Sequence, residues 1–148
     1  MNSRHVIATF LVCLGSLTSP SVRAQTQPSS VSPSESSAID TKGARHRGGD
    51  YPGKRPPWIA DAIKTVPPEY SYGDRQLGHQ GSGVFRLVLD PSTGSVTKVI
   101  IVKSTGFSTL DYGASISLQK WRFRPGKWQQ VDLPITFAMR PGTAWSPR

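Results

Sequence analysis

The chain has 148 residues, the size of one domain, and carries 18 Lys or Arg against 9 Asp or Glu, for a formal net charge of +9. A basic balance of this size favours acidic partners such as nucleic acid or anionic lipid and does not bear on the fold. Cys13 is the single cysteine of the sequence, which excludes a disulfide within the chain.

Residues 1–24 have the pattern of a secretory signal peptide. A mostly apolar stretch, "VIATFLVCLGSL", covers residues 6–17, and small residues at the −3 and −1 positions predict cleavage before Gln25. The apolar run is shorter than the about 20 residues that a membrane span needs, and an uncleaved anchor is the alternative. Cleavage removes Cys13, two basic residues and no acidic one, so the net charge falls from +9 to +7 and no thiol is left for catalysis or metal binding.

Residues 25–65 are predicted to form a disordered linker. Its first part, "QTQPSSVSPSESSAI", is dominated by Ser, Pro and Gln, and residues 42–55, "KGARHRGGDYPGKR", carry five bases and four glycines. Neither part supplies apolar residues for a core. Near the end of the linker Trp58 and Ile59 lie between proline pairs, which predicts one short helical turn on the edge of the domain.

The folded domain is predicted over residues 66–140, and residues 141–148 form a tail. The domain begins with a short helix to about Leu77. Ser71 and Asp74 have the spacing of a capping box, in which a hydroxyl and a carboxylate satisfy free backbone amides. Two glycines then end the helix.

The segment "GVFRLVLDPSTGSVTKVIIVKS" predicts a β-hairpin. Its strands lie near Gly83–Leu89 and Ser95–Lys103, and the proline and glycine of "DPSTG" supply the turn geometry. The second strand is apolar on both faces at its centre, "VIIV", so part of the sheet is expected to be covered on both sides.

A second helix follows the hairpin. Ser108 and Asp111 repeat the capping spacing, and a Pro-Gly pair at positions 125 and 126 stops the helix. Its buried face is predicted from residues that recur every three or four positions, which are Leu110, Ala114, Leu118 and Trp121.

The last predicted element is the strand "VDLPITF", whose residues alternate strictly between an apolar and a polar face. The order of elements predicts an α+β fold with a small three-stranded antiparallel sheet and two helices, in the sequence helix-strand-strand-helix-strand. The third strand is expected to pair with the first, because every neighbour is then antiparallel and the crossover can be right-handed. It then lies on an edge, where Pro134 is tolerated because no neighbour needs its N–H.

We predict no catalytic residue, no metal site and no cofactor, and therefore neither an enzyme nor a small-molecule substrate. His46 lies in the linker and His79 stands alone at a helix end, so no metal-ligand spacing exists. The acids of the domain each have an explanation as a cap, a turn residue or a surface residue. The glycine-rich "GHQGSG" precedes a strand rather than a helix, so no helix amides face a phosphate there.

The run "LQKWRFRPGKW", residues 118–128, interleaves bases with aromatic rings. Such a run can stack nucleic-acid bases and bind phosphates. Trp121 falls on the predicted buried face of the helix, however, so we expect the rings to anchor the helix to the sheet and the cations to face water. We therefore expect no nucleic-acid partner.

From Pro67 to Met139 the chain resembles the C-terminal domain of TonB-type energy transducers. The resemblance is carried by "PPEY", "LGHQGSGVFRLVLDPSTGSVTKVIIVKSTG", "LDYGA", "WRFRPGK" and "LPITF", which match in order and spacing. It implies the fold reached above and a periplasmic interaction module linked to TonB-dependent transmembrane transport. In the family this domain captures the TonB box of an outer-membrane transporter, a peptide that adds as an extended strand beside the last strand of the domain.

Carried over to this chain, the resemblance places partner binding on the last strand and on the segment before the first helix. The residues are Val131, Asp132, Leu133, Pro134, Ile135, Thr136 and Phe137, with Pro68, Glu69, Tyr70 and Tyr72. Two alternatives stay open. One is an inner-membrane-anchored transducer with a retained N-terminus, and the other is a structural or assembly module that pairs edge strands with another protein or as a homodimer.

Overall fold

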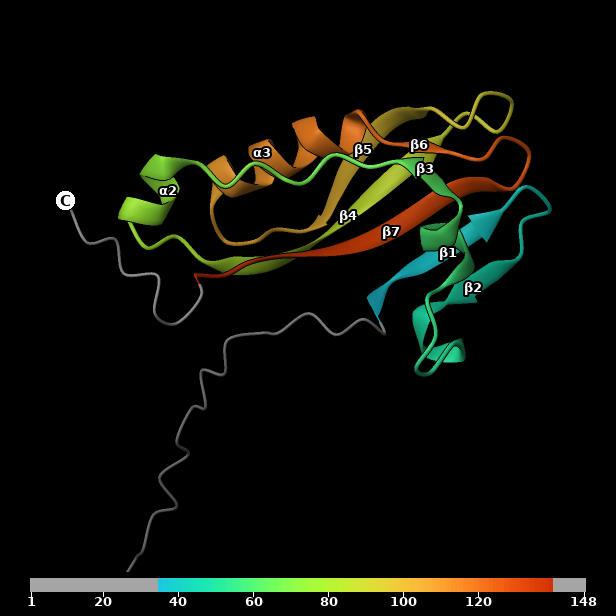
Figure 1. Ribbon diagram of the computed structural model, residues 1–148, viewed down its shortest axis with the longest axis horizontal. Helices are drawn as coiled ribbons and strands as arrows, with labels where there is room; N and C mark the ends of the chain where they lie inside the picture. Colours follow the sequence, from blue (N-terminus) through green and yellow to red (C-terminus); the bar gives the residue numbers. More distant parts are fainter. Residues whose placement is uncertain (1–34, 140–148) are drawn as a thin grey trace, which may run out of the picture.

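A five-stranded antiparallel sheet dominates the computed structural model, which describes residues 35–139 (Figure 1). Its strand order is β2-β1-β7-β4-β5. These strands are β1 (Ser37–Asp40), β2 (Arg45–Arg47), β4 (Gly81–Leu89), β5 (Val96–Lys103) and β7 (Trp128–Phe137). A second sheet pairs β3 (Ala62–Lys64) with β6 (Arg122–Phe123).

The helical elements are short except for one. They are the 3-10 turn η2 (Gly48–Asp50), α1 (Pro57–Ala60), α2 (Tyr72–Gln76) and α3 (Ser108–Gln119). Figure 1 shows α3 lying across one face of the large sheet, with α2 near one end of it and the β1–β2 hairpin at the other end. The predicted signal peptide and the tail at residues 141–148 lie outside the described residues. Within residues 35–139 no helix combines the length and the apolar character that crossing a membrane requires.

The predicted α+β fold is confirmed, and so is the pairing of the last strand with the first strand of the hairpin. β4 pairs antiparallel with β5 on one side and with β7 on the other. The predicted number of strands is wrong, because the large sheet has five strands rather than three. The two additional strands, β1 and β2, come from the segment that the sequence analysis treats as a disordered linker.

The linker prediction for residues 35–65 is therefore wrong. The Ser/Pro-rich composition of this segment gives no sign of β1. A four-residue strand needs only backbone pairing and a single buried side chain, which here is Ala38. The turn between β1 and β2 is closed by Asp40. Its carboxylate accepts hydrogen bonds from the backbone N–H groups of Lys42 and Ala44, both at 2.9 Å, and lies 3.1 Å from His46 Nε2.

The short helix predicted near Trp58 is confirmed as α1, and it contributes more than an edge contact. The Trp58 side chain is fully buried. Its ring packs edge-on against Trp128, with centroids 5.9 Å apart, and against Tyr51 at 5.8 Å. The segment before residue 66 is thus part of the hydrophobic core rather than a tether.

The capping prediction is confirmed for the hydroxyl of α2 but not for its carboxylate, which binds side chains instead of a free backbone amide, and it is wrong for α3. Ser71 is the N-cap of α2 and its Oγ accepts from the Asp74 backbone N–H at 3.0 Å. The N-cap of α3 is Phe107, without a side-chain cap. The reason is that the Asp111 carboxylate is already bound by the Thr105 backbone N–H at 2.8 Å and by the Ser104 hydroxyl.

The buried face of α3 matches the predicted spacing. Leu110, Ala114 and Leu118 have no exposed surface and pack on the sheet. The helix ends at Gln119, before the Pro-Gly pair expected to stop it, so Trp121 belongs to the loop that follows. Its indole N–H donates to the Val66 carbonyl at 2.8 Å.

The aromatic residues of the run at residues 118–128 serve packing, as expected. Phe123 is fully buried and Trp128 is 6% exposed. Asp61 organises the polar groups around them, because one carboxylate oxygen accepts from Trp128 Nε1 at 3.0 Å while the other lies 3.2 Å from Lys127 Nζ and 3.4 Å from Arg124 Nε. Two of the cations are therefore paired within the domain.

The expectation that both faces of the "VIIV" strand are covered is wrong. β5 is an outer strand of the sheet. Ile101 is 46% exposed and Val102 51% exposed, while Val99 alone of the four packs partly against the core. A continuous apolar run cannot by itself distinguish a central strand from an exposed edge.

Gly94, in the turn between β4 and β5, has a positive φ of 70°, and a Cβ there would collide with the Phe123 carbonyl oxygen. Gly126 also has a positive φ, of 82°, but a Cβ there meets nothing within 4 Å. We expect Gly126→Ala to cost about 1 kcal/mol of unfolding free energy, from backbone strain alone. Gly94→Ala should cost at least about 1 kcal/mol more, because the turn must also move away from β6. Urea unfolding of both variants measures the difference. Equal losses of unfolding free energy would show that the close approach to Phe123 does not affect stability.

Candidate functional site

The strand β7 has unequal neighbours on its two sides. On one side β4 pairs with it from Gln130 to Phe137. On the other side β1 pairs only with the stretch from Trp128 to Asp132. On the side of β1, the stretch Leu133–Phe137 therefore has no strand paired with it among residues 35–139, and we call it the open half of β7.

The predicted binding edge is thus half occupied by the protein itself. Val131 and Asp132 stand opposite Ala38 and Ser37 of β1, so the prediction that these two residues form a free edge is wrong. The Asp132 carboxylate is held by Arg86, whose Nε and Nη2 donate at 2.9 and 3.0 Å. The Ser37 hydroxyl donates to the same carboxylate at 3.4 Å. These contacts fasten β1, β7 and β4 to one another.

The side chains of the open half alternate as the sequence predicts. Leu133 and Phe137 are buried toward the helices, and Ile135 is half-buried on the same face. Thr136 is exposed on the other face, where its hydroxyl lies 2.9 Å from the hydroxyl of Ser82 on β4. The side chains therefore anchor the strand, and its free main-chain groups are what the edge offers to a partner.

Those main-chain groups are few. The β4–β7 register continues through Pro134 without a shift. We therefore infer that the backbone nitrogen of Pro134, which carries no hydrogen, faces away from β4. Antiparallel strands direct the N–H groups of alternate residues to opposite sides. The Thr136 N–H therefore faces the open side as well, and it is the one main-chain donor that the open half presents there.

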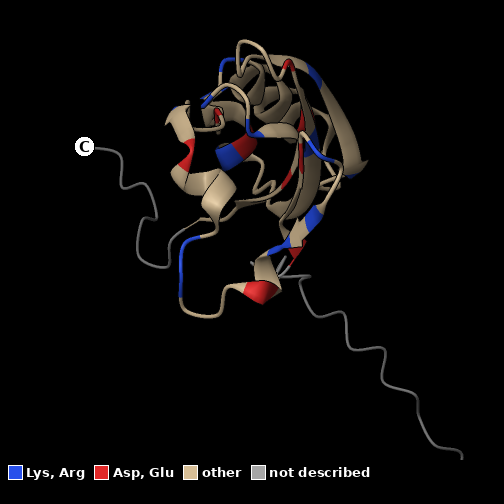
Figure 2. Ribbon diagram, turned by 90° about the vertical axis from the view of Figure 1, so that its right-hand side faces the viewer, with Lys and Arg blue, Asp and Glu red and all other residues tan. Residues whose placement is uncertain are grey.

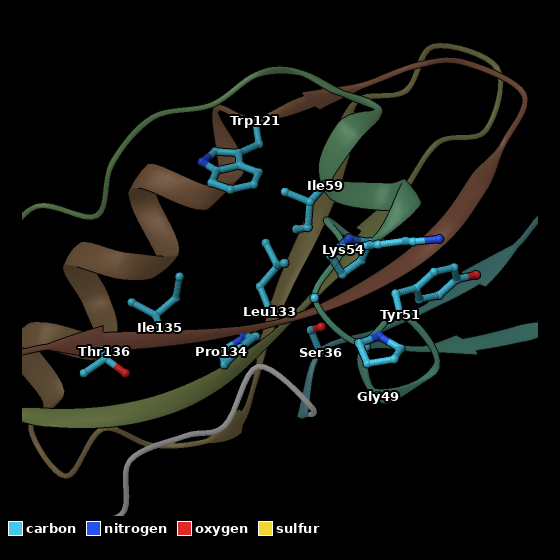
Figure 3. A pocket seen from close by; sticks show the side chains of 14 residues that line it. Ser36, Gly49, Tyr51, Lys54, Ile59, Trp121, Leu133, Pro134, Ile135 and Thr136 are labelled. Carbon is cyan, nitrogen blue, oxygen red and sulfur yellow. The ribbon is translucent and has the colours of Figure 1, made fainter.

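A groove of about 750 Å³ lies beside this open half. Leu133, Pro134, Ile135 and Thr136 form one wall of the groove. The opposite wall is formed by the segment between β1 and α1, including Tyr51 and Lys54, and by Ile59 of α1. Figure 3 shows Trp121, Ile59, Leu133 and Ile135 gathered on the helix side of β7.

The segment before α2 comes close to the far end of the open half. The Tyr70 ring packs edge-on against Phe137, with centroids 5.4 Å apart, and its hydroxyl donates to the His79 carbonyl at 2.6 Å. Glu69 is exposed and its backbone N–H donates to Ser117 Oγ at 3.3 Å. The exposed Tyr72 contacts Gln76 on its own helix, and Pro68 is half-buried. Of the four predicted residues, Tyr70 is the one whose described contacts join this segment to β7.

Asp74 holds this segment against α3. Its carboxylate accepts from the hydroxyls of Ser71 and Thr109 and lies 2.9 Å from His79 Nδ1. These hydrogen bonds, with that from Ser71 the strongest influence, lower the pKa of Asp74 to about 2. The carboxylate therefore fixes the position of α2, and with it the position of Tyr70.

Sequence reasoning missed half of the groove. Tyr51, Lys54 and Ile59 lie in a stretch whose glycines and bases indicate disorder, and no motif marks them. The one available signal is "PPWI", since a tryptophan and an isoleucine in an otherwise polar segment need a place to pack. Among the described residues no group of three His, Cys, Asp or Glu could hold a metal ion.

The fold and this edge define a small α+β domain in which a helix-strand-strand-helix-strand unit carries an N-terminal hairpin against part of its last strand. The chain belongs to the family described as Gram-negative bacterial TonB protein C-terminal, whose model matches residues 66–139. The match begins after the hairpin, so β1, β2, α1 and β3 lie outside it.

Three curated relatives show the extent of the similarity. "Protein TonB" of Neisseria meningitidis serogroup C is 33% identical over 72 residues, which cover 49% of this chain and 26% of the relative. The same protein of serogroup B, strain ATCC BAA-335 / MC58, is 33% identical over 72 residues and covered to 25%. "Protein TonB" of Neisseria gonorrhoeae is 32% identical over 72 residues and covered to 25%. No solved structure matches the chain.

The lowered pKa of Asp74 makes a prediction about stability against pH. Because the folded-state pKa of about 2 lies below the ordinary value of 3.8, the ionised carboxylate stabilises the fold above pH 3.8, and this contribution is lost as the pH falls toward 2. The melting temperature of Asp74→Asn should therefore lie below that of the natural chain at pH 5, and the gap should narrow steadily down to pH 2. Thermal unfolding followed by circular dichroism gives both values. A gap of constant size over this range would show that the ionised carboxylate is not what holds α2.

Proposed function

We propose that this protein is a periplasmic interaction domain that binds an extended peptide, the TonB box of an outer-membrane transporter, by strand addition to the open half of β7. The observation that carries the proposal is that Leu133–Phe137 pairs with β4 on one side but, among the described residues, with no strand on the other side, where β1 stops short of it. Membership of the TonB C-terminal family supports a role in TonB-dependent transport. Strand addition needs no catalytic or cofactor chemistry, which fits a domain whose acids act as caps and ion pairs.

The shape of the edge limits how a peptide docks. The strand β1 already covers Trp128–Asp132, so an added strand can pair only beyond Ser37, the first residue of β1, and runs along about five residues of β7. Main-chain hydrogen bonds supply the affinity in this mode, and alternate side chains supply the selectivity. Tyr70, packed on Phe137, lies near the far end of the added strand. The binding segment proposed here is therefore shorter than the whole of β7.

The proposal includes export. Residues 1–24 have a signal-peptide pattern, and the processed chain would begin at Gln25 and face the periplasm. The intact mass of the protein recovered from the periplasm distinguishes this from an anchored transducer. We expect the mass of residues 25–148, and recovery of the complete chain in the membrane fraction would favour the anchored alternative.

Assembly through edge strands is a second candidate, because the outer strand β5 exposes Ile101 and Val102. Pairing two copies of β5 antiparallel about the centre of its "VIIV" run, residues 99–102, would set Lys98 of one copy opposite Lys103 of the other. Like charges placed opposite one another destabilise such a pair. We therefore expect a monomer in sedimentation velocity at micromolar concentrations, and a concentration-dependent dimer would favour the assembly function.

Strand addition depends on the Thr136 N–H, so Thr136→Pro is the sharpest test. Proline removes the last main-chain donor of the open half and leaves the groups that pair with β4 in place. One lost hydrogen bond of about 1–1.5 kcal/mol weakens binding of a TonB-box peptide about ten-fold. Isothermal titration of the full chain with seven-residue peptides spanning TonB boxes measures the affinity.

The matched control is Thr136→Val. It removes the hydroxyl contact with Ser82 but keeps the backbone N–H, so peptide affinity should stay close to that of the natural chain. Circular dichroism shows whether both variants remain folded. Equal affinities for the natural, Val and Pro chains would contradict strand addition at this edge, and the absence of binding by the natural chain would remove the proposed function altogether.

A further inference from the structure

The groove beside the open half of β7 is built partly by residues outside the family match. The first of its two walls consists of consecutive residues of β7, from Leu133 to Thr136. The second comes from η2, from the loop between η2 and α1, and from Ile59 of α1, all of which precede residue 66. A peptide added beside β7 would therefore lie between the family fold and a segment that lies outside the family match.

The helix side of the groove is apolar and firmly held. Ile59, Leu133 and Ile135 all pack against the hydrophobic core. Trp121 is fixed by its hydrogen bond to the Val66 carbonyl and by the Phe123 ring, whose centroid lies 6.1 Å away. In Figure 3 these side chains surround a common space above the β7 ribbon. Such a site is preformed for an apolar side chain, because its walls lose little freedom on binding.

The opposite end of the groove carries a single charge. Lys54 is the one charged side chain among the residues that line the groove, and it is exposed. It forms no ion pair with any residue between positions 35 and 139. Figure 2 shows a blue stretch in the loop between η2 and α1, the loop that holds Lys54 and Arg55, and a red stretch on η2, where Asp50 precedes that loop. The rim thus favours a negative group on the ligand.

We propose that this groove is a selectivity site: it takes one large apolar side chain of the docked peptide against Ile59, Trp121 and Ile135, and it favours a carboxylate of the same peptide near Lys54. The inference rests on the proposed function and names the chemistry of its ligand. The geometry follows from strand alternation, since every second side chain of a strand beside β7 points to the helix side, where the apolar space lies. The partner is an extended peptide with one buried apolar residue and an acidic neighbour.

The first experiment varies the peptide. A seven-residue TonB-box peptide that binds the full chain is resynthesised with each apolar residue replaced by alanine in turn. One replacement should weaken binding about ten-fold or more, since burial of a Leu-sized side chain is lost at that position alone. Replacement of the acidic residue by its amide should weaken binding about two- to five-fold. Alanine replacements that all have equal and small effects would overturn the proposal.

The second experiment varies the protein. Lys54→Glu should weaken binding of the acidic peptide about two- to ten-fold and leave the amide peptide unaffected. Its matched control is Lys98→Glu, which changes the net charge equally but lies on β5, at the other edge of the sheet. An equal effect of the two variants would reduce the role of Lys54 to general charge and contradict the proposal.

A third variant fills the groove. Gly49 lines it, does not have the positive φ that excludes side chains, and has nothing within 4 Å of a built Cβ, so a large residue fits there without backbone strain. Gly49→Trp should weaken peptide binding ten-fold or more, while the control Gly49→Ala should leave it nearly unchanged. Retention of full affinity by Gly49→Trp, in a chain shown to be folded by circular dichroism, would overturn the proposal.

The experiments separate this inference from the function on which it rests. If Thr136→Pro weakens peptide binding while Lys54→Glu, Gly49→Trp and the alanine replacements in the peptide do not, strand addition is supported and the selectivity site is contradicted.

Other occupants of the groove also have distinct outcomes. A dimer that Gly49→Trp dissociates assigns the groove to a second copy. Tighter peptide binding by Val31→Glu, which changes the one aliphatic residue of positions 25–35, assigns it to the chain's own N-terminal segment. Either result overturns the proposal.

Discussion

The unequal pairing of β7 determines most of what is distinctive in this structure. The strand has ten residues, β4 pairs with it from Gln130 to Phe137, and the four-residue β1 covers only its first half. Main-chain groups that are left without a partner in a sheet favour pairing with another chain. An edge of five residues is short enough to discourage uncontrolled association, and Pro134 removes one of its donors. The same arrangement that leaves this edge open therefore also restricts what can attach to it.

The sequence predicted the parts of the fold that depend on local patterns. The hairpin turn, the cap of α2, the buried face of α3 and the alternation in β7 all follow from spacing within a few residues. It failed for β1 and β2, because β1 pairs with β7, about ninety residues away, and β2 pairs in turn with β1, and composition carries no trace of a distant partner. The open half of β7 was predicted as part of a fully free edge for the same reason. The second wall of the groove could not be predicted from the sequence, because Lys54 and Tyr51 lie in a glycine-rich loop that is positioned by Trp58.

The basic and aromatic run at the end of α3 shows how tertiary context decides the role of a motif. Its rings are used in three places: Trp121 against the groove, Phe123 in the centre of the core and Trp128 against Trp58. Asp61 neutralises two of its cations and also binds the Trp128 indole. A stretch that reads as a continuous surface for a charged ligand is thus divided among the interior, an ion-pair cluster and the wall of a groove.

The burial of Trp58 has a consequence for where this domain begins. The similarity to the TonB family starts at residue 66, whereas the residue with the largest fully buried side chain in the structure lies at position 58. The family match and the folded unit therefore have different boundaries. A chain cut at residue 66 would lose an aromatic ring from the centre of its core and would leave Trp128 without both of its ring partners, Trp58 and His46. The segment before residue 66 completes the hydrophobic core, although it lies outside the family match.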